Sequence, residues 1–148
     1  VHALKYSRAD YLAKYMGAQM AVRYKNYPEL AEAEVVMPVP LFPKRNRTRG
    51  YNQSELLAEN FAPLVGLPLD SKSLVRIKNT ISQTTLGRVG RLANMKGAFA
   101  YKNQEPIKGK TVLLIDDVAT TGATLEGCAE ALKAAGAKKV MAYTFARE

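Results

Sequence analysis

Residues 112–124 constrain the fold of this 148-residue chain more than any other segment. The segment begins with four apolar residues, Val112 to Ile115, and this lack of polar alternation is typical of a strand covered on both faces in a parallel sheet. Two carboxylates, Asp116 and Asp117, come next, followed by a turn of small and hydroxyl-bearing residues that opens a helix. Open α/β sheets bind ligands at the carboxyl ends of their strands. The segment therefore predicts an α/β fold with a binding site directly after this strand.

The residue types in this segment favour a sugar phosphate as the ligand. Ionised Asp116 and Asp117 only accept hydrogen bonds, so they suit a vicinal diol, which donates them. Backbone N–H groups and hydroxyls at a helix N-terminus suit a phosphate, and a glycine permits a tight backbone turn there. The predicted 5-phosphate-binding residues are Ala119, Thr120, Thr121, Gly122, Ala123 and Thr124. The plainer alternative is an acidic turn that caps a helix, although a cap needs only one such side chain.

Other phosphate-binding motifs do not fit this turn. No Gly-Lys-Ser/Thr follows it, and it contains a single glycine, so neither a P-loop nor a GxGxxG fingerprint is present. The order of apolar strand, Asp-Asp, two variable residues and Thr-Thr-Gly-Ala-Thr instead resembles the phosphoribosyl pyrophosphate (PRPP) signature of type I phosphoribosyltransferases. This resemblance implies that the acidic pair holds the ribose and the turn holds the 5-phosphate.

A second resemblance extends over most of residues 1 to 147 and indicates a more specific family. The segment from Val36 to Glu55, read together with the later residues given below, is similar to the competence protein F (ComF/GntX-like) family. Relatives usually carry an amino-terminal cysteine-rich zinc ribbon, whereas Cys128 is the only cysteine here. The later residues that carry the resemblance are Arg76, Thr80, Ser82 to Leu86, Arg88, Arg91, Asn94 and Gly97 to Phe99.

The resemblance also implies roles for basic segments outside the central run. The turn after an early strand receives the pyrophosphate in phosphoribosyltransferases, which implies that Lys44, Arg45 and Arg49 bind it here. Residues 76 to 94 resemble the flexible loop that covers PRPP. Solvated basic surface and a helix face that touches nucleic acid remain alternatives for these segments. The residues expected to act from the flexible loop are Arg76, Gln83, Thr84, Arg88 and Arg91.

Charge and composition indicate the class of partner. Residues 44–96 carry ten Lys or Arg and three acidic residues, so this part supplies +7 of the formal net charge of +9. Such a field attracts polyanions, including pyrophosphate and nucleic-acid backbones. No apolar run reaches the roughly 20 residues that span a bilayer, and no secretory signal is visible, so we expect a cytoplasmic protein.

The alternation of strands and helices predicts a doubly wound, mostly parallel α/β sheet. The resemblance implies that residues 1–148 form one phosphoribosyltransferase-like domain. Since the chain begins at Val1 without methionine, we expect it to be a C-terminal fragment of a longer protein. The spacing of Leu12, Tyr15, Met16, Met20 and Tyr24 predicts a helix over residues 8 to about 25 with this stripe in the core.

Further elements follow along the chain. A short strand is expected over residues 35–39, and Asn52 with Glu55 predicts the capped start of a helix. The inward residues of that helix are expected to be Leu56, Leu57, Phe61 and Leu64. Strand is also expected within residues 74–77 and 98–101, and a helix with Cys128 in the core leads to a last strand around Val140 to Phe145. Right-handed crossovers place the turns after Val39 and Ile115 on the same edge of the sheet.

Three hypotheses for the function remain open at this point. The resemblance implies a PRPP-binding protein that serves DNA uptake in natural transformation, with single-stranded DNA and a DNA-uptake helicase or other competence protein as partners. A second hypothesis is an active phosphoribosyltransferase that moves ribose 5-phosphate from PRPP to an unidentified nitrogen acceptor, with Mg²⁺ bound through PRPP. The third is a docking module that keeps the fold and has lost ligand binding. Whether the chain is an enzyme is left open by the sequence.

Overall fold

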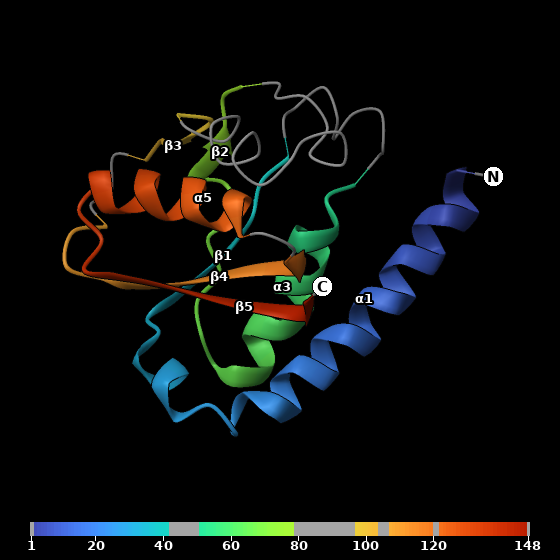
Figure 1. Ribbon diagram of the computed structural model, residues 1–148. Coiled ribbons are helices and arrows are strands. Elements are labelled where there is room, and N and C mark those ends of the chain that lie inside the picture. Colours follow the sequence, from blue (N-terminus) through green and yellow to red (C-terminus); the bar gives the residue numbers. More distant parts are fainter. Residues whose placement is uncertain (1, 42–50, 79–96, 104–106, 120–121, 148) are drawn as a thin grey trace.

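The computed structural model describes residues 2–41, 51–78, 97–103, 107–119 and 122–147. At its centre is a parallel sheet of three strands in the order β1-β4-β5. Helices lie on both faces of this sheet (Figure 1), which confirms the predicted α/β class. The strands are β1 (Val35–Pro38), β4 (Thr111–Ala119) and β5 (Lys139–Arg147), and the α-helices are α1 (His2–Tyr24), α3 (Gln53–Val65) and α5 (Ala123–Ala134).

Smaller elements complete the described fold. A 3-10 helix, η1 (Pro28–Glu32), connects α1 to β1. Strands β2 (Leu74–Arg76) and β3 (Phe99–Tyr101) form an antiparallel pair beside α5 (Figure 1), close to the ranges expected from the sequence. The segment between α3 and β2 returns along β1, where Leu69 forms an isolated parallel bridge to Val36.

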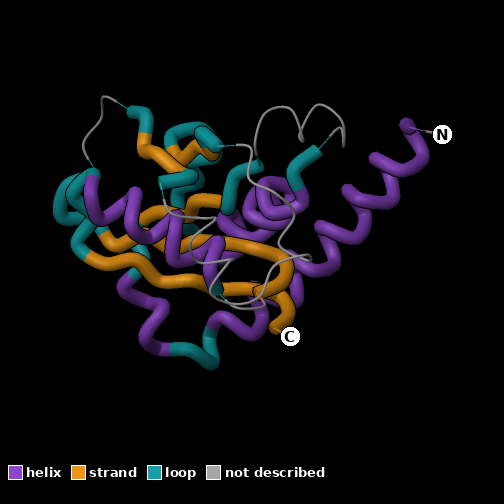
Figure 2. The backbone as a smooth tube through the Cα atoms, turned by 45° about the horizontal axis from the view of Figure 1, so that its top comes forward, coloured by secondary structure: helices purple, strands orange, loops and turns teal. Residues whose placement is uncertain are grey.

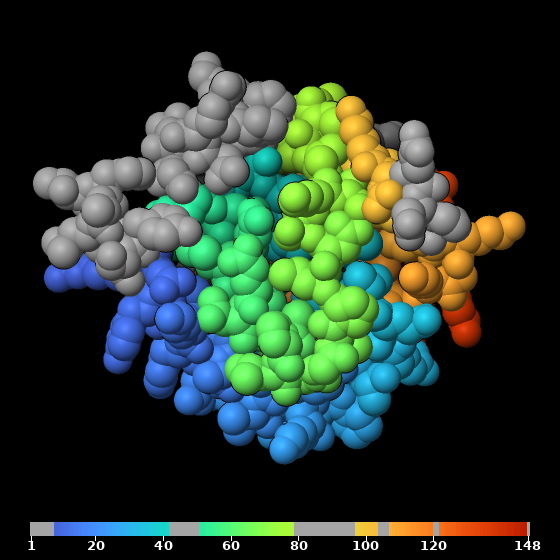
Figure 3. Space-filling model, turned by 180° about the vertical axis from the view of Figure 1, so that it is seen from behind, coloured from blue at the N-terminus to red at the C-terminus, as the bar shows by residue number. Residues whose placement is uncertain are grey.

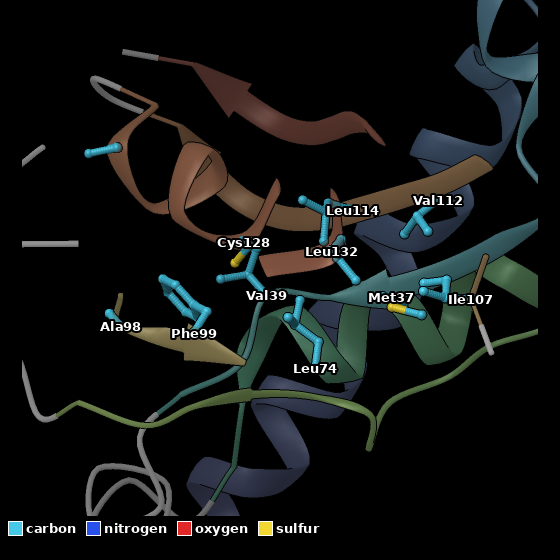
Figure 4. Packing of buried hydrophobic residues seen from close by; sticks show 11 residues of the cluster. Met37, Val39, Leu74, Ala98, Phe99, Ile107, Val112, Leu114, Cys128 and Leu132 are labelled. Atoms are coloured by element: carbon cyan, nitrogen blue, oxygen red, sulfur yellow. The ribbon is translucent and has the colours of Figure 1, made fainter. Parts of the chain in front are cut away.

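The central strand β4 supplies both halves of the core. Val112 and Leu114 point to the α5 side, where Cys128 and Leu132 from α5 meet them (Figure 4). The alternate residues Leu113 and Ile115 point to the opposite face. All four β4 residues are at most 1% exposed, so the unbroken apolar run reflects burial on both faces of the strand, as the sequence predicted.

The three strands of the sheet do not all end at the same position along its carboxyl edge. The N–H of Val39 donates to the carbonyl of Ile115 over 3.0 Å, so the turns after β1 and after this point of β4 do share one edge. Beyond Ile115, β1 has ended, whereas β4 continues beside β5, with Asp116 opposite Thr144 and Ala119 opposite Arg147. The prediction that the strand stops at Ile115 is therefore wrong, because pairing with β5 extends β4 through the acidic doublet.

Helix α1 is rotated relative to the predicted orientation. The prediction that its large stripe is core holds for Met20, which is 2% exposed, but is wrong for Leu12 and Tyr15, which are 53% and 57% exposed. The small residues Ala13 and Gly17 are buried instead. Because Gly17 has no side chain, α1 can approach Asn60 of α3 closely. The amino-terminal turns of α1 extend away from the sheet (Figure 2). No helix within the described ranges is long and apolar enough to cross a membrane.

Helix α3 begins as predicted and ends differently. The Asn52 side chain accepts the N–H of Ser54 over 3.0 Å and caps the helix, and Gly66 ends it with a φ of 73°. Phe61 is fully buried, whereas Leu64, predicted to point inward, is 60% exposed in the last turn. That prediction is wrong because the described residues do not cover the helix end. Figure 3 shows α3 at the surface of the face opposite α5, with α1 alongside.

We expect Gly17→Ala to destabilise the protein. A Cβ at this position would stand 2.8 Å from Cβ of Asn60 in α3, so the two helices must separate. The cost of overpacking, about 1–3 kcal/mol, exceeds the gain of about 1 kcal/mol in helix propensity. Val22→Ala is the control because Val22 is 67% exposed on the same helix. Urea unfolding measures both variants; a Gly17→Ala protein as stable as the wild type would contradict the close approach.

Candidate functional site

The carboxyl-terminal half of β4 lies beside α3 (Figure 1). Asp116 belongs to this half of the strand and contacts Ser54 in the first turn of α3. Its Oδ1 accepts the hydroxyl of Ser54 over 2.7 Å and the backbone N–H of Asp117 over 2.9 Å. The pKa of Asp116 also reflects a side-chain hydrogen bond between the carboxyl groups of Asp116 and Asp117. Ser54 therefore fixes the carboxyl at Oδ1, and the carboxyl of Asp117 lies beside it.

The environment of Asp116 disfavours its charge. Burial is the largest cause that raises the pKa of this carboxyl, from 3.8 to about 7, and the neighbouring Asp117 raises it further. The Ser54 hydroxyl and the Asp117 N–H oppose this rise because both donate to the ionised form. A half-buried carboxyl whose charge costs free energy in the folded protein is typical of a functional group rather than of a group that stabilises the fold.

Asp117 follows Asp116 on β4, and both residues are half-buried. Oδ1 of Asp117 accepts the N–H of Val118 over 2.9 Å. Successive residues of a strand leave the backbone on opposite faces, but the side chains of Asp116 and Asp117 come close enough for a hydrogen bond between their carboxyl groups. The two residues therefore form one acidic pair.

The turn after β4 is described at its two ends. Ala119 is the last residue of β4, and Gly122 precedes α5 with a φ of 80°, a left-handed conformation that favours glycine. The N–H of Glu126 makes the first helical bond to the carbonyl of Gly122, so Ala123 and Thr124 lie in the first turn of α5. This turn directs a helix N-terminus to the edge of the sheet that carries Asp116, as an anion site requires. Thr120 and Thr121 lie outside the described residues.

Arg76 is the one expected flexible-loop residue that the structure describes, and that expectation needs correction. It is the last residue of β2, opposite Phe99 of β3, and it is 7% exposed. Its guanidinium lies 5.4 Å from the centre of the Phe99 ring, a cation–π contact. Arg76 therefore belongs to the antiparallel pair of β2 and β3 rather than to a loop. The other predicted pyrophosphate and loop residues, Lys44, Arg45, Arg49, Gln83, Thr84, Arg88 and Arg91, lie outside the described residues.

Cys128 of α5 is a core residue near Asp116. It is fully buried on α5, and burial raises the pKa of its thiol, with a further rise from Asp116 and an opposing effect of Arg76. This confirms the prediction of a core residue; a thiol that stays protonated is a poor nucleophile.

Two residues that sequence reasoning did not assign to the site are part of it. Asn52 was predicted only as a helix cap, and Ser54 was not singled out. Asn52 also donates from Nδ2 to the carbonyl of Val39 over 3.1 Å, and Ser54 reaches Asp116. The signal in the sequence is weak, because hydroxyl and amide side chains near a helix start are common caps.

A cavity of about 70 Å³ lies elsewhere, between α1 and β5. It is lined in part by Met20, Arg23, Tyr27 and Tyr143. Ligand pockets are typically about 300–1,000 Å³, so this cavity is too small to enclose a nucleotide-sized ligand. The chemistry of the chain concentrates at the carboxyl end of β4 instead.

Comparison with known proteins agrees with this geometry. The model of the family described as "Phosphoribosyl transferase domain" matches residues 53–148. The chain is 31% identical to "DNA utilization protein YhgH" of Salmonella typhi, with 99% of the chain and 65% of that protein covered. It is 35% identical to "Competence protein F" of Haemophilus influenzae, with 86% of the chain and 57% of that protein covered. The predicted resemblance to competence protein F is thus confirmed, although the chain spans less than two-thirds of the length of these relatives.

A solved structure confirms the fold. The purine phosphoribosyltransferase of Pyrococcus horikoshii matches with a TM-score of 0.57 at 17% identity, and the match covers 90% of this chain and 73% of that one.

The raised pKa of Asp116 predicts that Asp116→Asn stabilises the protein above neutral pH. The carboxyl has a pKa of about 7 when folded and about 3.8 when unfolded, so folding loses stability as pH rises between these values. Asparagine keeps an acceptor for Ser54 without the charge, and we expect a gain of about 1–2 kcal/mol at pH 8 that disappears near pH 4. Thermal unfolding across this pH range measures the gain. Glu130→Gln, an exposed acid on α5, is the control, and a destabilised Asp116→Asn protein at pH 8 would refute the charge cost.

Proposed function

Because the chain belongs to the phosphoribosyl transferase domain family, we propose that it binds PRPP at the carboxyl end of β4. The observation that supports this most is the arrangement of Asp116 and the N-terminus of α5 at one edge of the sheet, beside the turn that follows β1. A hydroxyl acceptor and an anion site at this edge match the two ends of a ribose 5-phosphate. The disfavoured charge of Asp116 supports a ligand site over a docking module that has lost ligand binding.

Each part of PRPP has a proposed partner. Asp116 and Asp117 accept hydrogen bonds from the ribose hydroxyls, and residues 119–124 donate backbone N–H groups and hydroxyls to the 5-phosphate. Lys44, Arg45 and Arg49 neutralise the pyrophosphate, since cationic donors form the stronger hydrogen bonds to phosphate. Gln83, Thr84, Arg88 and Arg91 belong to the segment proposed to cover the bound molecule. Mg²⁺ is chelated by the diphosphate and ribose oxygens of PRPP, and no protein side chain is assigned to it.

A transferase reaction at this site is the alternative that the family description favours. A nitrogen nucleophile would form a bond to carbon 1 of the ribose as the bond from carbon 1 to the pyrophosphate oxygen breaks, and pyrophosphate would leave with the electron pair. The protein would position the reactants and neutralise charge. Release of pyrophosphate from PRPP in the presence of a panel of nucleobases and amines distinguishes this enzyme from a module that only binds PRPP.

The acidic doublet provides the direct test of PRPP binding. We expect calorimetry with PRPP and Mg²⁺ to show saturable binding to the wild type, and Asp116→Asn and Asp117→Asn each to weaken it at least about tenfold, because each loses a charged acceptor. Glu130→Gln removes one charge from exposed α5 and is the matched control. Absence of binding to the wild type, or equal binding to all four proteins, would reject the site.

The names of the relatives motivate a proposal for the biological role. We propose that this chain acts in DNA uptake as a cytoplasmic protein, with single-stranded DNA and a helicase or other competence protein as partners. The support is the description of relatives as a DNA utilization protein and a competence protein, together with the net charge of +9.

Nucleic-acid binding is measurable apart from PRPP. We expect a single-stranded oligonucleotide to bind with an affinity that falls steeply as salt is raised, since counterion release drives contacts to phosphates. Arg88→Ala/Arg91→Ala is expected to weaken binding several-fold and to flatten the salt dependence. Fluorescence anisotropy at several salt concentrations gives both quantities, with Lys133→Ala on exposed α5 as the control. Salt-insensitive or undetectable binding would count against DNA as a direct partner.

A further inference from the structure

Three hydrogen bonds run from the end of β1 through the start of α3 to Asp116. Asn52 donates from Nδ2 to the carbonyl of Val39 over 3.1 Å, and its Oδ1 accepts the N–H of Ser54 over 3.0 Å. Ser54 then donates from Oγ to Oδ1 of Asp116 over 2.7 Å. Asn52 and Ser54 are 8% and 5% exposed, so these bonds are shielded from water.

These contacts exceed what a helix cap requires. A cap needs only the bond from the Ser54 N–H to Oδ1 of Asn52. In addition, the Asn52 amide reaches Val39, the residue that follows β1, and the Ser54 hydroxyl reaches β4. Both contacts lie at the N-terminus of α3, whose dipole favours a negative charge nearby. The first turn of α3 is therefore built around the carboxylate of Asp116.

We propose that Ser54 is a positioning residue of the PRPP site, and that Asn52 holds Ser54 in place for this purpose. Ser54 occupies Oδ1 of Asp116 and so fixes the orientation in which this carboxylate meets the ribose hydroxyls. Asn52 fixes the start of α3 relative to the end of β1, and thereby sets the distance from Ser54 to β4. This inference rests on the proposed function, since it concerns the group assigned to the ribose.

Ser54 also favours the charged form of Asp116, because its hydroxyl donates to the ionised carboxylate. Asp117 on β4 and Thr144 on β5 are the neighbours of Asp116 in the sheet. Cys128 of α5 lies within electrostatic range of both Asp116 and Arg76 of β2. Asp117 and burial act against ionisation. Loss of the Ser54 hydroxyl leaves these opposing effects uncompensated, and less of Asp116 is ionised at neutral pH.

The test is Ser54→Ala, compared with Ser54→Thr, which keeps the hydroxyl. PRPP with Mg²⁺ is titrated into each protein between pH 6 and 9, and the ratio of the dissociation constants of variant and wild type removes the titration of the ligand itself. We expect Ser54→Ala to bind about tenfold more weakly at pH 7, because it loses a hydrogen bond to a charged group, and to recover part of the loss at pH 9. Ser54→Thr is expected to remain within a few-fold of the wild type.

Two results would overturn the proposal. If Ser54→Ala binds PRPP as the wild type does, the hydroxyl positions nothing. If the ratio of dissociation constants is large and the same at every pH, Ser54 acts only through the stability of α3. Circular dichroism confirms that each variant is folded before titration.

A second measurement separates this inference from the proposed function. The pKa of the Asp116 carboxyl is read by NMR from its carboxyl carbon in the protein without ligand. We expect Ser54→Ala to raise it by about half a pH unit or more, and Asn52→Ser, which keeps a cap but is too short to reach Val39, to raise it less. An unchanged pKa in Ser54→Ala refutes the positioning role even if PRPP binds, and an unchanged pKa in Asn52→Ser removes Asn52 from it. Failure of the wild type to bind PRPP refutes the proposed function instead.

Discussion

The site depends on the unequal lengths of the strands beside β4. β1 ends at Pro38, opposite Ile115, whereas β5 continues beside β4 as far as Arg147. On the β1 side, the last residues of β4 therefore have no strand partner among the described residues. Ser54, in the first turn of α3, contacts Asp116 of β4 instead. If β1 were as long as β5, its backbone would occupy this place. A half-buried carboxyl that Ser54 fixes at one oxygen follows from that difference.

At Asp116, the charge that suits ligand binding lowers the stability of the folded chain. Burial and Asp117 make the charge of Asp116 unfavourable in the folded chain, while a ribose would benefit from a charged acceptor in a site shielded from water. Around it, β4 is held on both faces by apolar packing, with Val112 and Leu114 against α5 and Leu113 and Ile115 toward the α1 and α3 face. This core keeps the strand end in place although the group it carries is destabilising, a common trade in binding sites.

Sequence patterns predicted those features that depend on neighbouring residues. The apolar run of β4, the cap at Asn52, the glycine at position 122 and the core position of Cys128 all follow from local spacing and are present. The rotation of α1 was not predictable from its stripe, because the stripe does not show that Gly17 packs against Asn60. The end of β4 and the position of Arg76 likewise depend on partner strands, β5 and β3. The bond from Ser54 to Asp116 joins residues 62 positions apart, a pairing that neither segment reveals alone.

The most direct test of the central claim is to map PRPP binding on the backbone by NMR. Amide shifts are recorded as PRPP with Mg²⁺ is added to the protein labelled with ¹⁵N. The account predicts that the largest changes fall on Ser54, Asp117 and residues 122–124, where the end of β4 meets the first turns of α3 and α5. Changes concentrated instead around the cavity between α1 and β5, at Arg23 and Tyr143, or no changes at all, would contradict it.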